Sequence, residues 1–287
     1  MLKKLKYFLR YIFISDEKYI KYKFKKYLKY ELNLDNPKSF NEKLQWLKLH
    51  DRTPLHTKCA DKYRVRDYVK EKIGDKYLIP LIFVSNKLKD INKNNFPDFP
   101  VIVKPNHSRG AHIIKDKNNF DFENLQKILK KELSTNFYYR TREWQYKDIK
   151  PLIVVEKLLL DDEGKIPKDY KFLCMNGKVE LIQVDSNRLT DHEKTLYNKK
   201  WERQNFEFNF PAGKDIIKPK NLEEMISIAE ILSRDFIFVR VDLYTIKQKI
   251  YFGELTFHPA GGFGWFKPQK IDFELGEKLN LPIKGKL

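Results

Sequence analysis

The first 75 residues carry apolar positions at helical spacing. Before residue 30, aromatic and aliphatic residues recur among many lysines at Phe8, Tyr11, Ile12, Ile20, Phe24, Tyr27 and Leu28. Such a stripe predicts basic amphipathic helices. Ser39 followed by Glu42 is a capping-box signature, which predicts a helix that begins there. Another helix is expected to open near Pro54 and to stop at Gly74.

The pattern becomes richer in strands further along the chain. Runs of β-branched and aromatic residues predict strands near residues 78–84, 100–105, 112–114, 153–159, 169–175 and 178–184. Asn176 and Gly177 separate the last two runs, and an Asn-Gly pair in this position is the strongest local signal for a hairpin.

A second predicted hairpin, residues 240–256, carries the most informative side chains. If its turn centres on Gln248, Asp242 and Glu254 lie directly opposite each other and share one face with Thr256. Facing carboxylates repel, so a cation lies between them, one stays protonated, or Arg240 and a lysine neutralise them. Two carboxylates suit Mg²⁺. The alternative is an exposed pair that is solvated or salt-bridged at the surface.

The composition indicates a folded protein with excess positive charge. The chain has 287 residues, of which 41% are hydrophobic, and a formal net charge of +18. This charge predicts an anionic partner such as nucleotide phosphates, an acidic glycan, nucleic acid or a lipid surface. A biased genome composition that favours lysine and asparagine explains the excess equally well.

Several classes of protein are disfavoured. Cys59 and Cys174 lie in unrelated surroundings, which argues against a disulfide framework or a structural zinc site. No apolar run approaches the ~20 residues that span a bilayer. Arg10 interrupts the N-terminal apolar run and no cleavage site follows, so we expect a cytoplasmic protein. No nucleic-acid-binding module is recognisable, and nucleic acid is not an expected partner.

The basic segment of residues 1–30 has two interpretations. In the first, the segment attaches to the inner face of an anionic membrane, because lysine side chains and aromatic rings are favourable at the membrane interface. Alternatively, its apolar stripe packs on the rest of the protein, as most such stripes do, and this second interpretation is favoured.

A polar loop follows the strand that ends near Lys104. Its members include His107, Ser108, Arg109 and Gly110, which offer an anion backbone N–H groups, a hydroxyl and a guanidinium. Lys104 can reach the same anion. The loop lacks the P-loop pattern, and an ordinary hairpin loop is an equally good interpretation. His107 and His112 are not expected to form a metal pair.

Several strings of the chain, in this order, resemble the ATP-grasp superfamily. They are Val103-Lys104-Pro105, Val155-Glu156-Lys157, Asp169-Tyr170-Lys171, Arg240-Val241-Asp242 and Gly253-Glu254-Leu255-Thr256. More closely, four further strings resemble the TupA-like ATP-grasp family, named for teichuronopeptide biosynthesis. These are residues 40–47, 61–63, 142–146 and 252–257.

The resemblance implies an α+β fold in which two subdomains grip ATP, preceded by a helical extension. We expect three regions: the helical extension at residues 1–75, the first subdomain with the phosphate loop at 76–155, and the second subdomain with the metal site at 156–287. By this likeness Lys104 and Lys171 contact the phosphates, and the loop of residues 106–110 closes over them. Glu156, Lys157 and Leu158 form the adenine hinge, and Asp169 lies near the ribose.

The same resemblance implies a metal site and two arginines near the reacting group. Asp242 and Glu254 would hold Mg²⁺. In many relatives an Asn stands as a third ligand where this chain has Thr256. The Thr256 hydroxyl can coordinate the metal or hold a metal-bound water, but this departure puts a second metal ion in doubt. Arg240 and Arg188 would face the transferred phosphoryl group.

Such enzymes generally join a carboxylate to an amine through an acylphosphate. The family resemblance suggests an amino acid or amine attached to a uronic acid of a bacterial surface polysaccharide, and the positive charge is compatible with an anionic glycan. A metal-dependent glycosyltransferase that uses a nucleotide sugar is the alternative. A basic, non-enzymatic adaptor is a third interpretation, in which Asp242, Glu254 and Lys104 have no function.

Overall fold

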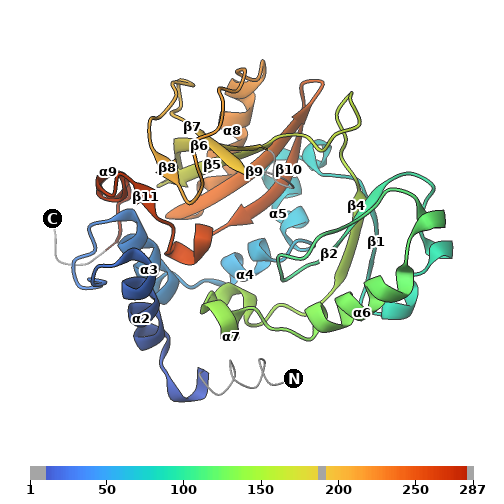
Figure 1. The fold of residues 1–287 in the computed structure, drawn as a ribbon, viewed down its shortest axis with the longest axis horizontal. Coiled ribbons are helices and arrows are strands. Elements are labelled where there is room, and N and C mark those ends of the chain that lie inside the picture. Colours follow the sequence, from blue (N-terminus) through green and yellow to red (C-terminus); the bar gives the residue numbers. More distant parts are fainter. Residues whose placement is uncertain (1–10, 187–191, 283–287) are drawn as a thin grey trace.

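The computed structural model describes residues 11–186 and 192–282. It contains helices and two main antiparallel sheets, so the predicted α+β class is confirmed (Figure 1). The helical extension before residue 75 comprises α2 (Asp16–Leu28), α3 (Phe40–His50), α4 (Pro54–Ala60) and α5 (Val65–Ile73). The short 3-10 turns are η1 (Asp75–Tyr77), η2 (Leu88–Asp90), η3 (Lys93–Asn95), η4 (Lys117–Asn119), η5 (Trp144–Tyr146) and η6 (Pro259–Gly262).

The first sheet has four strands in the order β1-β4-β2-β3. They are β1 (Leu81–Ser85), β4 (Ile153–Lys157), β2 (Val101–Pro105) and β3 (His112–Ile114). Helix α6 (Phe122–Leu133) covers one face, because Leu125 and Leu129 pack with buried strand residues such as Val103. The short helix α7 (Tyr138–Thr141) follows α6.

The second sheet has five strands in the order β10-β9-β5-β6-β7. They are β5 (Asp169–Met175), β6 (Lys178–Ser186), β7 (Glu193–Tyr197), β9 (Phe238–Ile246) and β10 (Lys249–Thr256). Helices α8 (Leu222–Ser233) and α5 pack on one face. On the other face lie α3, α9 (Lys270–Lys278) and the small sheet of β8 (Glu207–Phe208) and β11 (Phe266–Lys267). Apolar clusters thus cover both faces of this sheet.

Both predicted hairpins are present, and each turn has two residues with positive φ. Asn176 and Gly177 join β5 to β6 with φ values of 49° and 79°, and Lys247 and Gln248 join β9 to β10 with 49° and 63°. Two such residues are typical of type I′ turns, which match the twist of the strands.

The register of the β9–β10 hairpin depends on a bulge. Asp242 pairs with Glu254 as predicted, but the turn centre lies between Lys247 and Gln248 rather than on Gln248. A regular ladder from this turn would pair Asp242 with Gly253. The irregularity between Phe252 and Glu254 shifts the register by one residue and brings the two carboxylates opposite each other.

The predicted capping box is confirmed, whereas the long helix from Pro54 to Gly74 is wrong. The Ser39 side chain and Glu42 cap the start of α3 reciprocally. Residues 61–64 separate α4 from α5, because the Asp61 carboxylate accepts hydrogen bonds from the backbone N–H groups of Tyr63 and Arg64. Aspartate side chains that bond nearby backbone in this way compete with helix formation.

Helix α2 packs on the protein, as the favoured interpretation of the N-terminal stripe predicts. Ile20 and Phe24 are fully buried and contact Leu32. Tyr22 and Tyr27 are exposed. Residues 1–10 lie outside the described part, so membrane attachment through residues 1–30 stays a prediction. Among the described helices, none is long and apolar enough to cross a bilayer.

The division into three regions stays a prediction. The border expected after residue 155 falls within β4, which pairs with β1 and β2 on both sides of that point.

Gly276→Ala tests the packing of α9 on the start of α3. A Cβ at Gly276 would overlap Lys38 O and lie 2.8 Å from Ser39 C, and backbone atoms cannot yield. We expect the free energy of unfolding, measured in urea, to fall by about 1–3 kcal/mol. The exposed neighbour Glu277→Ala is the control and should change it little. A Gly276→Ala protein as stable as the unmodified chain would contradict this packing.

Candidate functional site

An arginine joins the acidic pair of the β9–β10 hairpin. Arg240 donates from Nε to Asp242 Oδ1 and from Nη2 to Asp242 Oδ2, each at 2.6 Å. The same Nη2 lies 3.1 Å from Glu254 Oε1 and 3.1 Å from Thr256 Oγ1. Arg240 thus bonds both carboxylates, which is one of the three expected ways to relieve their repulsion. A lysine also contributes.

That lysine is Lys171, which lies opposite Asp242 in the β5–β9 ladder. Its ammonium donates to Asp242 Oδ2 at 2.9 Å and also to Asp169. Asp185 Oδ2 lies 3.7 Å from the same nitrogen. All four side chains are buried. Lys171 and Asp169 thus belong to the same charged network as Asp242, and Asp185 is an additional member. Their expected contacts with phosphate and ribose stay predictions.

The two carboxylates of the hairpin differ in exposure and in acidity. The side chain of Asp242 is 2% exposed and that of Glu254 is 43% exposed. Burial raises the pKa of Asp242 to about 6, against the opposing effect of Arg240 and Lys171. Burial also acts to raise the pKa of Glu254, but Lys62, Arg240 and Lys171 outweigh it and lower that pKa to about 2. Asp242 is therefore protonated first on acidification.

At the first sheet, Lys104 and Glu156 form an ion pair. Lys104 Nζ lies 3.0 Å from Glu156 Oε2, and Arg66 Nη1 of α5 lies 3.0 Å from Oε1 of the same carboxylate. Glu156 therefore keeps a cationic partner in Arg66 if Lys104 turns towards another anion.

The expected hinge residues lie at the end of β4. The backbone N–H of Lys157 donates to Pro80 O and that of Leu158 donates to Pro100 O, each at 3.0 Å. Both N–H groups are thus used within the protein, so a base bound here would have to use other groups of this segment.

The loop of residues 106–110 begins at a fixed point. Asn106 exchanges hydrogen bonds with Leu152 and also donates to Lys150 O. Arg109 stacks over the Phe137 ring at 5.1 Å, and the Ser108 hydroxyl accepts weakly from the N–H of Gly110 at 3.4 Å.

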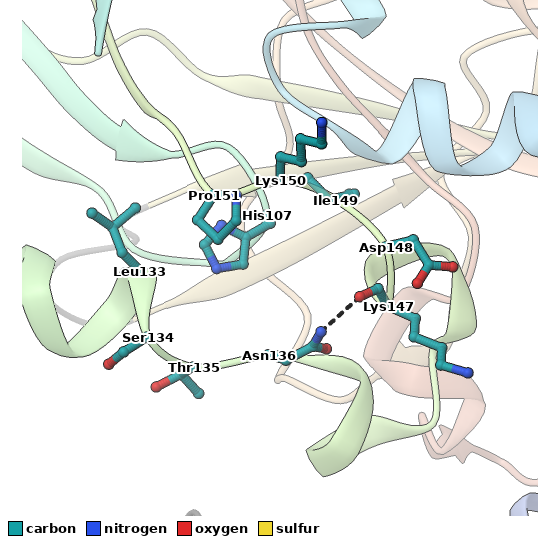
Figure 2. A pocket seen from close by; sticks show the side chains of 10 residues that line it. All are labelled: His107, Leu133, Ser134, Thr135, Asn136, Lys147, Asp148, Ile149, Lys150 and Pro151. Carbon is teal, nitrogen blue, oxygen red and sulfur yellow. Dashed lines mark hydrogen bonds between the residues drawn. The ribbon is translucent and has the colours of Figure 1, made fainter. Parts of the chain in front are cut away.

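His107 of the same loop lines a pocket. The side chain is buried, and the pocket, shown in Figure 2, has a volume of about 350 Å³. The other lining residues are Leu133, Ser134, Thr135, Asn136, Lys147, Asp148, Ile149, Lys150 and Pro151. His107 bonds Asn106 and His112 bonds Glu132, so the two imidazoles have different partners.

Sequence reasoning missed Lys62, which bonds to the loop of residues 106–110. Its backbone N–H donates to Asn106 O at 3.0 Å and its ammonium donates to Ser108 O at 2.5 Å. The only feature of the sequence that pointed to Lys62 was the string of residues 61–63, one of those that resemble the family. No feature of the sequence indicated that Arg66 would pair with Glu156.

Helix α3 holds the loop after β10. Gln45 donates to Gly261 O at 3.1 Å and to Gly262 O, and Lys48 donates to Gly261 O. Ala260, Gly261 and Gly262 have positive φ, which explains the glycines.

The donor set of the hairpin suits a divalent cation in part. Asp242, Glu254 and Thr256 supply oxygens on one face, but Arg240 contacts all three. Within residues 11–186 and 192–282, no group of three or more His, Cys, Asp or Glu side chains is arranged to hold a metal ion. Substrate phosphates would have to complete the coordination, as is common for Mg²⁺. Arg188 lies outside the described residues.

The raised pKa of Asp242 gives a testable dependence of stability on pH. The folded state holds this proton up to pH about 6, whereas the ordinary aspartate value is 3.8. The folded state then binds more protons between these values, so the contribution of Asp242 to stability falls as pH rises from about 4 to 6. Relative to Asp242→Asn, the unmodified chain should lose on the order of 1 kcal/mol per pH unit across this window.

Urea unfolding of both proteins at pH 4.5, 5.5 and 6.5 measures this difference. A constant offset between them reflects the lost partner of Arg240 and Lys171. The quantity to compare is the free energy of unfolding of the unmodified chain minus that of Asp242→Asn. A value that stays constant or increases from pH 4.5 to 6.5 would contradict the raised pKa.

Comparisons with known proteins identify relatives at the level of family and fold. The model of the TupA-like ATP-grasp family matches residues 42–280. No curated protein matches the chain. The solved structures with detectable likeness include an L-amino acid ligase from Bacillus licheniformis, with 14% identity and a TM-score of 0.48 over 96% of this chain.

Two further solved structures are similarly distant. D-alanine–D-alanine ligase from Bacillus anthracis complexed with ATP has 17% identity and a TM-score of 0.41 over 69% of this chain. The ATP-grasp ligase PsnB, complexed with a precursor variant, Mg and ADP, has 10% identity and a TM-score of 0.43 over 82% of this chain. The chain spans between 53% and 66% of the length of these three proteins.

The family match extends over most of the chain, and it includes both sheets, the loop of residues 106–110 and the acidic hairpin. The chain belongs to the TupA-like ATP-grasp family.

Proposed function

We propose that the protein is an ATP- and Mg²⁺-dependent ligase that joins a carboxylate to an amine. Membership of the ATP-grasp family supports this proposal. The observation that carries it is the pairing of Asp242 with Glu254, joined by Arg240 and Lys171 on adjacent strands. Acids that would hold a metal and cations that would bind phosphate are thereby placed side by side.

In this proposal the phosphates of ATP lie between the two sheets. Lys104 exchanges Glu156 for a phosphate oxygen, and Arg66 keeps Glu156 neutralised. Lys171 binds from the second sheet. The backbone of Ser108 to Gly110 and the guanidinium of Arg109 cover the phosphates, and His107 supports that loop from behind. The adenine and ribose meet the hinge of Glu156, Lys157 and Leu158, with Asp169 nearby.

Asp242 and Glu254 would hold Mg²⁺, with the hydroxyl of Thr256 beside them. Arg240 would then move off one or more of these oxygens towards the transferred phosphoryl group. A bound Mg²⁺ neutralises charge on phosphate oxygens. Arg240 and Lys171 supply fixed positive charge for the same purpose, and Arg188 is proposed to do so as well.

The chemistry requires position and charge rather than a nucleophilic side chain. The substrate carboxylate attacks the γ-phosphorus of ATP, the bond to the β-phosphate oxygen breaks, and ADP leaves. The amine then attacks the acyl carbon of the acylphosphate, loses a proton, and releases phosphate with formation of an amide. Both steps increase negative charge on oxygens, which the lysines and arginines stabilise.

We propose an anionic sugar or glycan of a bacterial surface polysaccharide as the carboxylate substrate. The net charge of +18 supports an anionic partner, and the anchored loop of residues 258–263 would contact it. The reaction would take place in the cytoplasm, at or near the inner face of the membrane, where the basic residues 1–30 would make a peripheral contact.

Lys104→Ala tests the nucleotide site. Loss of a charge-assisted hydrogen bond costs about 1.5–3 kcal/mol, so the Kd for Mg-ATP should rise roughly 10- to 100-fold. Calorimetric titration measures the Kd, and Lys200→Ala, an exposed lysine of a turn, is the matched control. Binding that Lys104→Ala leaves unchanged would rule out this placement of the phosphates.

The same titration separates ligase from glycosyltransferase. We expect ATP and ADP to bind in the presence of Mg²⁺ and UDP- or GDP-sugars not to bind. Binding of the nucleotide sugars alone would support the transferase instead.

A further inference from the structure

The pocket of Figure 2 brings His107 together with two other segments of the chain. Residues 133–136 begin at the end of α6, and residues 147–151 precede β4. Asn136 Nδ2 donates to Lys147 O at 2.7 Å and ties these two walls to each other. The volume of about 350 Å³ is at the lower end for small-molecule sites. Apart from His107, no described residue of the proposed nucleotide and metal site lines the pocket.

The proton of the His107 ring can be assigned from the neighbours of the ring. Asn106 Oδ1 accepts from the backbone N–H of Leu152 at 2.8 Å, so this atom is the amide oxygen. His107 Nδ1 lies 3.1 Å from the same oxygen and therefore carries the proton. Burial lowers the pKa of His107, so the ring is neutral near pH 7. In this tautomer Nε2 presents a lone pair and acts as an acceptor.

That lone pair lacks a donor. His107 is 2% exposed, and no atom of the described part of the chain is a hydrogen-bond partner of Nε2. Figure 2 shows the outer edge of the ring directed towards the wall of residues 133–136. The backbone groups of Thr135 and Glu132 that act on the ring favour its protonated form, so they are acceptors as well. A buried acceptor without a donor costs about 1–3 kcal/mol, which a ligand that supplies the donor would recover.

Other polar side chains of the pocket also offer acceptors. The hydroxyls of Ser134 and Thr135 donate to Lys131 O at 2.9 and 2.7 Å, which leaves their oxygen lone pairs for a ligand. Asp148 is an exposed carboxylate. A carboxylate likewise accepts hydrogen bonds and does not donate them.

The two lysines of the pocket direct their ammonium groups elsewhere. Lys147 Nζ lies over the rings of Tyr11 and Tyr138, 5.8 and 5.6 Å from the ring centroids. Figure 2 shows the side chain of Lys150 directed away from His107. The side chains that would meet a ligand therefore offer mainly acceptors, which disfavours an anion and favours a ligand with several N–H donors.

We propose that this pocket is a binding site for a small primary amine in its ammonium form. The ammonium would donate to His107 Nε2 and to the hydroxyl oxygen of Thr135, and the carbon chain would contact Leu133, Ile149 and Pro151. An ammonium carries three N–H donors and no acceptor, which matches this lining. The inference goes beyond the proposed ligase reaction and does not depend on it.

Calorimetric titration near pH 7, without nucleotide, tests the inference with three probes of similar shape. They are n-butylammonium, 1-butanol and butyrate, which carry a positive charge, no charge and a negative charge. We expect saturable binding of n-butylammonium, with a Kd at least about tenfold lower than that of 1-butanol, because hydrogen bonds from a charged donor are stronger. Butyrate should not bind.

His107→Asn is the matched variant. The amide nitrogen of asparagine replaces Nδ1 as the donor to Asn106 Oδ1, but no atom replaces Nε2. The Kd for n-butylammonium should therefore rise at least about tenfold. Glu123→Gln removes an exposed carboxylate of α6 outside the pocket, and this control should leave the Kd unchanged.

A measurement on the unmodified chain keeps the inference testable if His107→Asn does not fold. With ¹⁵N-labelled histidine, n-butylammonium should move the Nε2 resonance of His107 upfield, because that lone pair gains a donor, and should leave Nδ1 almost unchanged. Absence of saturable amine binding would overturn the inference and leave the pocket to water. Equal or tighter binding of 1-butanol or butyrate would overturn it as well. Nucleotide binding is measured separately, so neither failure bears on the proposed function.

Discussion

Buried charge is the constraint on which the second sheet depends. Asp242 lies in the middle of β9 with Arg240 and Lys171 as its partners. Asp242 and Lys171 are buried, and the Arg240 side chain is 14% exposed. Removal of one member of such a network leaves an uncompensated charge and typically costs about 3–5 kcal/mol. Replacement of a buried ion pair by packed apolar residues is often neutral or stabilising, so the network by itself is weak evidence for stability.

Connections between elements far apart in sequence bring the two sheets to one site. Arg66 and Lys62 both come from the helical extension, yet Arg66 pairs with Glu156 of the first sheet and Lys62 bonds to Ser108 in the loop after β2. The positive charge of Lys62 also acts on Glu254 of the second sheet. The helical extension is therefore bonded both to the first sheet and to the loop of residues 106–110.

Much of this could be predicted from sequence because the informative signals are local. Asn176 with Gly177 predicts a turn, and alternation places Asp242 and Glu254 on one face. The bulge beside Gly253 could not be foreseen from the sequence. The predicted pairing of Asp242 with Glu254 was right because centring the turn on Gln248 shifts the register by one residue, as the bulge does. Asp185 was missed because its register opposite Asp169 also depends on an irregularity. Lys62 could not be identified from local sequence signals, because its partners Asn106 and Ser108 are distant in the sequence.

A crystal structure with Mg²⁺ and adenylyl imidodiphosphate tests the central claim most directly. We expect the ion at about 2.1 Å from an oxygen of Asp242 and one of Glu254, with phosphate oxygens completing its shell. Lys104 should have left Glu156 for a phosphate. An ion held without either carboxylate, or a nucleotide bound away from the β9–β10 hairpin, would contradict the assignment of this face as the catalytic centre.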